Sequence, residues 1–401
     1  MALPLLHSVA FLLLLQCTGC TQIGKSHTLR PDPVTNPYSP IMLEGSWLPD
    51  QTQDIDFDGL TKIPSKHVVV SDVSALDGVN QHNYLIHHLG KFWVMWSDGP
   101  GVEDRVGQRV KFATSEDCIH WSESDYITPE PPLSGSKSKF FNTRSDQGFR
   151  WISRGFWNRD GELIALASLD EAAGFFGPSL ALHAFRFDSI NDSWEEMGVV
   201  RENAINNFPP KKIPTGEWMI SQRPYDYREK GVYFLVGGIV AIDHWQAFPV
   251  LGSSSELFAE EPFWWELPDH NLMVLFRDNR KSGYLYRSFS IDHGRSWTKP
   301  IRTNFPDATS KINGTRLNDG RYLLVSNPNP AGRDPLALAI SADGMVFSSM
   351  GYLVGGHRVD YPHVLEHKDF LLIAFSSNKQ TVEILKIQTK DLSVLEAQGR
   401  H

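Results

Sequence analysis

The stretch Asn318-Asp319-Gly320-Arg321-Tyr322-Leu323-Leu324-Val325 joins a tight-turn sequence to a short run of strand-forming residues. Asn, Asp and Gly tolerate the positive φ angles of a short hairpin turn, and the aromatic and aliphatic residues that follow favour a buried strand. Five other stretches repeat this order of a polar or glycine-containing turn and then apolar residues: 88–96, 159–166, 214–220, 268–275 and 367–374. The pattern therefore predicts six similar hairpins.

The spacing of these hairpins decides the fold class. The turns fall near residues 90, 161, 216, 270, 320 and 369, and most intervals leave room for one four-stranded antiparallel sheet. Few segments have a helical period. We therefore predict an all-β protein, a six-bladed β-propeller of four-stranded antiparallel blades. The alternative is a β-sandwich with repeated hairpins.

A second motif supports the propeller. The segment Ser290-Ile291-Asp292-His293-Gly294-Arg295-Ser296-Trp297 fits the pattern S-x-D-x-G-x-x-W of an Asp-box, and shorter relatives occur at 115–121 and 341–347. In this motif the Asp side chain accepts hydrogen bonds from its own turn, Gly permits the bend and Trp packs beneath it. We interpret these boxes as structural.

Composition excludes several classes of function. The chain has 401 residues and a net charge of -9, so it lacks the basic surface of a nucleic-acid-binding protein. Its three cysteines exclude a disulfide scaffold. The segment 54–59 has the first half of a calcium loop, but Ser65 stands where a bidentate Glu is needed. We expect no metal and no cofactor.

The N-terminal residues are typical of an exported protein. Residues 1–20 contain an apolar run from Leu3 to Leu15 that fits a signal peptide, and Thr18-Gly19-Cys20 resembles the end of a bacterial lipobox. We expect a periplasmic, cell-surface or extracellular protein, which contacts a membrane only through a lipid anchor on Cys20. The interpretation divides the chain into a signal peptide (1–20), an arm or linker (21–60) and the propeller (61–401).

Polar residues gather where the propeller should have its channel. In a propeller the innermost strand of each blade lines the channel, and here it should precede each turn. These strands carry charged or amide side chains at equivalent places: 81–83, 150–154, 206–207, 260–261, 311–313 and 360–363. The second strands end in a further polar set that should rim the same mouth: 97–98, 170–171, 222–223, 277–278, 326–327 and 378–379. Because burying such groups without partners costs about 1–3 kcal/mol each, we expect them to be paired or to face a wet site.

At these positions the sequence resembles the sialidase superfamily, whose members are six-bladed propellers that cleave terminal sialic acid or related keto-acid sugars. The resemblance covers most of residues 75–390. It implies that Tyr361 is the nucleophile and that Glu261 polarises it. It also implies that Arg277 and Arg333 bind the substrate carboxylate.

The acid of the family lies in a loop after the first hairpin. The corresponding loop, Gly99–Arg109, offers Glu103 and Asp104 and follows Asp98. We select Asp104 as the acid and base of the reaction, with Asp98 as the alternative.

One family residue is missing. The first of the family's three arginines lies on the inner strand of blade one, where this chain has His82 and Asn83. We expect these two residues, together with Arg154 and Lys311, to contribute to substrate binding. Two guanidinium groups can still hold a carboxylate, but the missing arginine leaves the identity of the sugar open.

The predicted function is that of an exported exo-acting glycoside hydrolase acting on a terminal, acidic sugar of a glycan or glycoconjugate. A phenol nucleophile suits a keto-acid sugar because a carboxylate nucleophile would be repelled by the substrate carboxylate. Two alternatives stay open. One is a carbohydrate-binding propeller without catalysis, and the other is a propeller glycosidase that uses paired carboxylates on a non-sialic sugar, with Glu171 or Asp360 as a partner. Each candidate also has an ordinary structural interpretation as a buried ion pair, a core hydrogen bond or a solvated charge.

Overall fold

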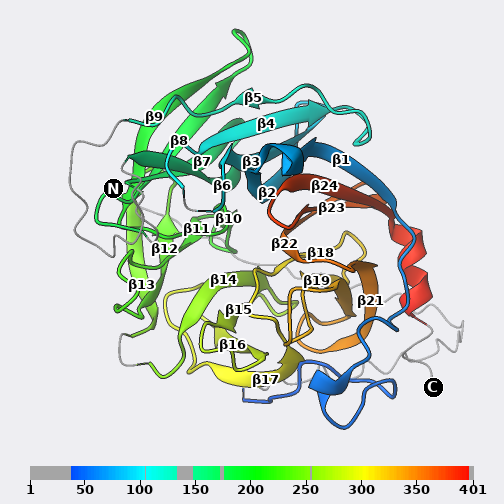
Figure 1. Ribbon diagram of the computed structural model, residues 1–401. Coiled ribbons are helices and arrows are strands. Elements are labelled where there is room, and N and C mark those ends of the chain that lie inside the picture. Colours follow the sequence, from blue (N-terminus) through cyan, green and yellow to red (C-terminus); the bar gives the residue numbers. More distant parts are fainter. Residues whose placement is uncertain (1–37, 104, 133–147, 172–175, 253–254, 397–401) are drawn as a thin grey trace, which may run out of the picture. The chain divides into compact units, whose positions relative to one another are not determined.

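The strands form a propeller. The computed structural model describes residues 38–103, 105–132, 148–171, 176–252 and 255–396. Within these residues the strands make six four-stranded antiparallel sheets, arranged as the blades of a β-propeller around a common centre (Figure 1). The predicted fold class is confirmed. No helix in the described ranges is long and apolar enough to cross a bilayer.

Blades 1 to 5 each use four strands in sequence order. Blades 1 and 2 contain β2 (Gly78–His88), β3 (Lys91–Pro100), β4 (Arg109–Ser115), β5 (Asp125–Tyr126), β6 (Phe149–Arg159), β7 (Glu162–Glu171), β8 (Ala181–Asp188) and β9 (Ser193–Glu202). Blades 3 and 4 contain β10 (Lys211–Lys212), β11 (Trp218–Gln222), β12 (Val232–Gly237), β13 (Trp245–Leu251), β14 (Ala259–Glu266), β15 (Leu272–Asp278), β16 (Tyr284–Ser290) and β17 (Ile301–Pro306). Blade 5 contains β18 (Asn313–Arg316), β19 (Tyr322–Ser326), β20 (Leu336–Ser341) and β21 (Phe347–Val354).

The ends of the described chain close the ring in blade 6. This sheet has the order β22 (Val359–His367), β23 (Phe370–Ser377), β24 (Thr381–Gln388) and then β1 (Lys66–Asp72), which comes from the other end of the sequence. β1 pairs with β24 antiparallel, from Lys66 opposite Lys386 to Asp72 opposite Thr381. Figure 1 shows this pairing as a blue strand beside a red one. Because the chain continues from β1 into blade 1, the backbone hydrogen bonds between β1 and β24 hold the first blade to the last.

The six hairpins lie where the repeat predicts them. In every blade the predicted turn joins the innermost strand to the second strand. At the turn of blade 2, Asp160 and Gly161 have φ angles of 52° and 98°, which is the backbone of a two-residue hairpin that matches the twist of its strands. All inner strands therefore begin at one end of the channel, and all second strands end there.

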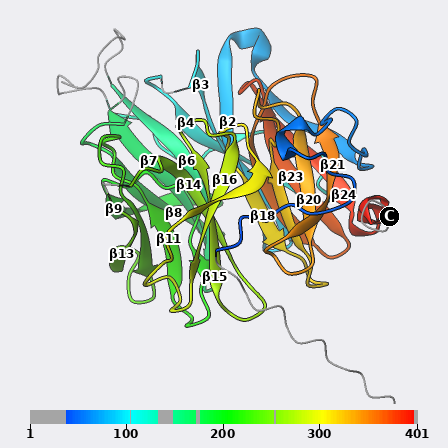
Figure 2. The ribbon, with the colours of Figure 1, turned by 90° about the horizontal axis from the view of Figure 1, so that it is seen from below.

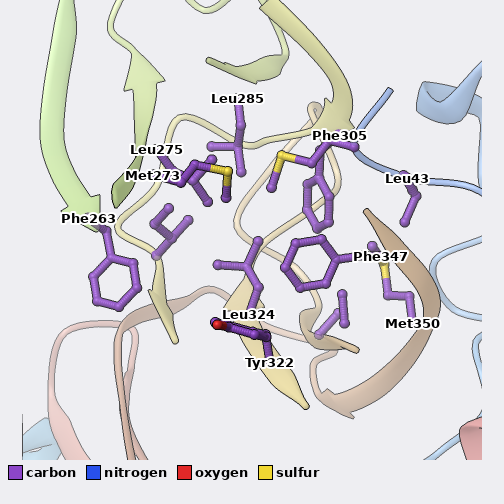
Figure 3. Close-up of a cluster of buried hydrophobic side chains, with 14 of the residues drawn as sticks. Leu43, Phe263, Met273, Leu275, Leu285, Phe305, Tyr322, Leu324, Phe347 and Met350 are labelled. Carbon is purple, nitrogen blue, oxygen red and sulfur yellow. The ribbon is translucent and has the colours of Figure 1, made fainter. Parts of the chain in front are cut away.

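The segment before β1 packs along the outside of blade 5. Leu43 and Lys62 make parallel bridges with Phe347 and Tyr352. Leu43 also joins the hydrophobic cluster between blades 4 and 5, where Phe263, Met273 and Leu275 meet Tyr322, Leu324 and Phe347 (Figure 3). Two short 3-10 helices, η1 (Thr52–Asp54) and η2 (Ser74–Leu76), flank β1, and a third, η3 (Thr389–Leu395), contacts β21 and β24 (Figure 2). The core thus lies between blades, which fixes each inner strand against its neighbours.

The three Asp-box segments have one geometry. Each begins at the end of the third strand of its blade, on the face opposite the ends of the second strands. In each, the Ser hydroxyl donates to the Asp carboxylate, which accepts two backbone N–H groups of its own turn. The carboxylate stabilises the turn by accepting hydrogen bonds from its backbone N–H groups. A purely structural role therefore accounts for the Asp-boxes.

Candidate active site

Four inner strands carry an extra residue near the end where they begin. The register against the second strand shifts by one residue within 81–84, 153–155, 260–263 and 360–363, on β2, β6, β14 and β22. A β-bulge of this kind bends the strand and turns a side chain away from its regular direction. The same feature in four blades brings side chains from distant parts of the sequence to one end of the channel.

Three of these bulges contain a non-glycine residue in the left-handed region. His82, Glu261 and Tyr361 have φ angles of 56°, 48° and 59°. A backbone of this kind costs about 1–3 kcal/mol per residue and persists where the surrounding structure enforces it, often at functional sites. A proline follows both Glu261 and Tyr361, and proline is tolerated at a bulge because it has no N–H to donate to the sheet.

Tyr361 lies at the centre of a compact polar cluster. It is 6% exposed, and its hydroxyl donates a hydrogen bond to the Glu103 carboxylate. The ring of His82 packs against the Tyr361 ring with centroids 4.3 Å apart, and His82 Nε2 lies 3.6 Å from Glu103. Burial and the adjacent Glu103 carboxylate raise the pKa of Tyr361 well above its usual value, so the phenol is neutral at pH 7.

Glu103 is the ionised partner in this cluster. Burial alone would raise its pKa, but the Lys379 ammonium, which contacts its second oxygen, and the hydrogen bond from Tyr361 lower the pKa below the ordinary value. Burial and nearby cations, Arg154 first among them, lower the pKa of His82 well below 6.5, so its ring is neutral. The cluster therefore holds a neutral phenol on an ionised carboxylate.

Two guanidinium groups meet beside Tyr361. Arg277 donates to the carbonyl oxygen of Thr309 at 3.3 Å, and Arg333 donates to the same oxygen at 2.9 Å. Thr309 itself has a φ of 55°, which directs its carbonyl between them. Each arginine also has a carboxylate partner, because Arg277 Nη1 lies 2.9 Å from Glu261 and Arg333 contacts Asp360.

Electrostatics connects the arginines to the tyrosine. Burial opposes the charge of Arg277, but the carboxylates of Glu261 and Glu260 raise its pKa above the usual value, and Tyr361 adds to this. Arg333 in turn favours the ionised form of Tyr361. The Tyr361 phenol thus has a proton acceptor, Glu103, in contact with it and two permanent cations that act on it through their charge.

A cavity of about 370 Å³ adjoins the cluster between blades 1 and 6. Its walls include Glu103, Arg358 and Lys379, together with the backbone around Gly78 and Gly101. Glu103 is shared by the cavity and the tyrosine. A ligand group in this space would therefore contact the carboxylate that holds the Tyr361 hydroxyl.

The comparisons with known proteins agree with this architecture. Residues 241–373 match the family described as BNR repeat-like domain, a range that contains the Asp-boxes of blades 4 and 5. A Dyadobacter fermentans protein of unknown function aligns with a TM-score of 0.64 and 15% identity, over 82% of this chain and 99% of that chain. A protein described as a sialidase aligns with a TM-score of 0.61 and 17% identity, over 87% of this chain and 35% of that chain. The NanB sialidase from Streptococcus pneumoniae aligns with a TM-score of 0.64 and 11% identity, over 83% and 71%.

The chain is a six-bladed propeller with a sialidase-like fold, and its residues 241–373 match a BNR repeat-like domain. No protein with a curated description matches it. Identities of 11–17% establish a shared fold, and the chemistry of this sialidase-like propeller has to be argued from its own side chains.

The predicted residues of the propeller fall into two groups at this mouth. Tyr361, Arg277, Arg333, Glu261 and His82 belong to one connected cluster. Within it the neighbour of the Tyr361 hydroxyl is Glu103, whereas the family resemblance implied Glu261, which instead pairs with Arg277. The reason is the bulge in β14, which directs Glu261 toward the end of β15.

Arg154 and Lys311 meet at Asn207. Arg154 donates to the Asn207 side-chain oxygen at 3.1 Å. Lys311 Nζ donates to the Tyr84 hydroxyl at 2.7 Å, and that hydroxyl donates to the Asn207 carbonyl at 2.6 Å. Burial lowers the pKa of Lys311 to about 7. The charges of Arg154 and Lys311 also act on His82, which connects this buried group to the cluster.

Three predicted residues lie outside these two groups: Asn83, Asp104 and Asp98. Asn83 is buried, and neither atom of its amide is hydrogen-bonded to a described residue. Asp104, the predicted acid, lies outside the described residues. Asp98, its alternative, is held by Lys111 at 3.0 Å and by the Asn80 amide at 2.9 Å. Among the described residues no group of three or more His, Cys, Asp or Glu side chains could hold a metal ion.

Sequence reasoning did not assign a role to Glu103 or Lys379. Glu103 lies in the loop that offered three acids in close succession, and Lys379 follows the second strand of blade 6 in the predicted rim. The signal for Lys379 was its place among the polar residues of that mouth, and the signal for Glu103 was its place in the acidic loop after the first hairpin.

Proposed function

We propose that this protein is an exported, exo-acting glycoside hydrolase of the sialidase-like class that removes a terminal acidic sugar. The observation that carries the proposal is the buried Tyr361 hydroxyl, held by an ionised carboxylate and flanked by two guanidinium groups. Each of these groups has a task in the cleavage of a keto-acid sugar.

Tyr361 is the nucleophile in the proposed reaction. Its oxygen attacks the anomeric carbon while its proton passes to Glu103, and the bond from that carbon to the leaving oxygen breaks. The leaving oxygen takes a proton from an acid, for which Asp104 is our candidate. Water then attacks the anomeric carbon, gives its proton to the same acid, and releases the Tyr361 oxygen, which recovers its proton from Glu103. Two displacements retain the configuration at the sugar.

Arg277 and Arg333 hold the substrate carboxylate. Their shared contact with the Thr309 carbonyl keeps the two planar groups side by side, and Glu261 and Asp360 fix them from behind. Charge-assisted hydrogen bonds to a carboxylate are about twice as strong as neutral ones. His82, Asn83, Arg154 and Lys311 are our candidates for contacts to the rest of the sugar.

The alternative with paired carboxylates has less support. Asp360, one of its candidates, contacts Arg333 and accepts from Arg358 at 2.6 Å. Both oxygens of the Asp360 carboxylate are thereby engaged, so Asp360 supports Arg333 and is not free to meet a sugar. A binding propeller without catalysis would not need a phenol in contact with an ionised carboxylate.

A substrate panel tests the proposal. We expect the purified protein to release 4-methylumbelliferone from an α-sialoside at least about a hundredfold faster than from neutral galactosides or glucosides, because two buried cations favour the substrate that carries a carboxylate. A glucuronide in the panel separates a general preference for acidic sugars from one for keto-acid sugars. Turnover of neutral glycosides alone would contradict the proposal, and sugar binding without release of the fluorophore would favour a binding protein.

Export rests on residues 1–20, which lie outside the described part of the chain. We expect the full-length chain, produced in a bacterium with an intact secretion pathway, to be recovered outside the cytoplasm and shortened near residue 20. Mass spectrometry of the mature N-terminus measures this. If Cys20 carries a lipid, Cys20→Ser should move the protein from the membrane fraction to the soluble fraction. An uncut cytoplasmic chain would contradict export.

A further inference from the structure

A tight turn of blade 6 places a lysine at the tyrosine. The turn between β23 and β24 contains Asn378 and Lys379, with φ angles of 53° and 61°, and closes through a hydrogen bond from Gln380 N to the Ser377 carbonyl at 2.9 Å. Asn80 N on β2 donates to the Lys379 carbonyl at 2.9 Å. The backbone of Lys379 is therefore fixed against blade 1 as well as within blade 6.

The side chain of Lys379 reaches the reacting groups. Its ammonium contacts one oxygen of Glu103, whose other oxygen accepts the Tyr361 proton, and lies 5.3 Å from the centre of the Tyr361 ring. The Lys379 side chain is only 17% exposed. A carboxylate rotates about its last bond unless both oxygens are held, so the contact with Lys379 also fixes the oxygen that faces Tyr361.

We propose that Lys379 is a positioning residue, whose ammonium group holds one oxygen of the Glu103 carboxylate so that the other faces the Tyr361 hydroxyl. The proposal rests on the function proposed above and adds a part to it. Since His82 is neutral, Lys379 supplies the cation that contacts Glu103, and it does so from the neighbouring blade.

Other described groups also act on Glu103. His82 of β2 lies 3.6 Å away and is neutral, and Tyr361 of β22 is a neutral donor. Arg333 and Arg358 act on Glu103 through their charge, and both are held by Asp360. Lys379 is the cation that both contacts Glu103 and, after burial, has the largest effect on its pKa. Removing this ammonium should therefore raise the pKa of Glu103.

The test compares Lys379→Met and Lys379→Arg in the full chain. Since the base works only when ionised, Lys379→Met should move the acid limb of the kcat/KM profile up by about one pH unit, which lowers the rate about tenfold at pH values well below that limb. The less well oriented carboxylate should lower kcat by about a further threefold, so that kcat falls about thirtyfold in all at those pH values, with KM changed less than about threefold. Lys379→Arg should restore kcat to within about fivefold, because it returns the charge. Lys368→Met is the matched control, since Lys368 also sits in a left-handed turn of blade 6 (φ 53°) but on the opposite face.

A second readout does not depend on turnover. The protonation of Glu103 can be followed by infrared difference spectra of carboxylate-labelled protein against the same protein carrying Glu103→Gln. We expect Glu103 to protonate at higher pH in Lys379→Met than in the wild type, and in Lys379→Arg near the wild-type value. An unchanged Glu103 titration in folded Lys379→Met would overturn the role of Lys379. A wild-type protein that cleaves no glycoside would overturn the proposed function, while this titration still decides whether Lys379 controls Glu103.

Discussion

Tyr361→Phe is expected to lower kcat on an acidic glycoside at least about a thousandfold while the protein stays folded. The substitution keeps the ring that packs against His82 and removes only the oxygen that attacks the sugar. Glu103 keeps its contact with Lys379, so no buried charge is left without a partner. Initial rates on the fluorogenic sialoside and the thermal unfolding temperature of both proteins measure the two effects.

Tyr126→Phe is the control for the loss of a tyrosine hydroxyl. Tyr126 lies on the short outer strand of blade 1 and is 38% exposed. Its variant should keep wild-type rates. Full activity in Tyr361→Phe would refute the tyrosine mechanism and leave a carboxylate as the nucleophile to be sought among the acids of the mouth.

Arg277→Met should weaken both the site and the fold. The substitution removes one of two cations for the substrate carboxylate, which should lower kcat/KM on the acidic glycoside about a hundredfold, mainly through KM. It also leaves Glu261, which is 7% exposed, without its ion-pair partner. Breaking a buried pair from one side lowers the free energy of unfolding by about 3 kcal/mol. Urea unfolding followed by tryptophan fluorescence measures the second effect.

A double variant separates the two roles of Arg277. Adding Glu261→Gln to Arg277→Met removes the stranded charge, so most of the lost stability should return while kcat/KM stays low. Arg302→Met on the exposed outer strand of the same blade should change neither quantity. Recovery of kcat/KM in the double variant would show that Arg277 serves Glu261 and does not bind substrate.

The fold was accessible from the sequence because its signals are local. A hairpin turn such as Asp160-Gly161 can be recognised from a few consecutive residues, since positive φ angles favour Asp, Asn and Gly. Asp292 and its neighbours form a closed set of hydrogen bonds within their own turn, so the motif can be recognised without knowledge of the rest. The closing of blade 6 by β1 has no such signal, because its pairing with β24 joins residues far apart in the sequence.

Only the general location and the residue types of the candidate site could be predicted from the sequence. The residue types at the mouth could be predicted, but their partners depend on bulges that shift a strand by one residue. The sequence does contain one sign of these bulges, because a proline within an inner strand marks a place where strand pairing is interrupted. Such prolines follow Glu261 and Tyr361. The choice among Asp98, Glu103 and Asp104 could not be made from spacing, because a loop has no period that aims its side chains.

The order of synthesis gives the pairing of β1 with β24 a further consequence. β1 is among the first strands to leave the ribosome, and its partner, Thr381–Gln388, is the last strand made. The ring of blades therefore cannot close before β24 has been made, and β1 stays without its pairing partner until then. If the chain is exported as proposed, this delay leaves the ring open while the chain still has to cross a secretion channel.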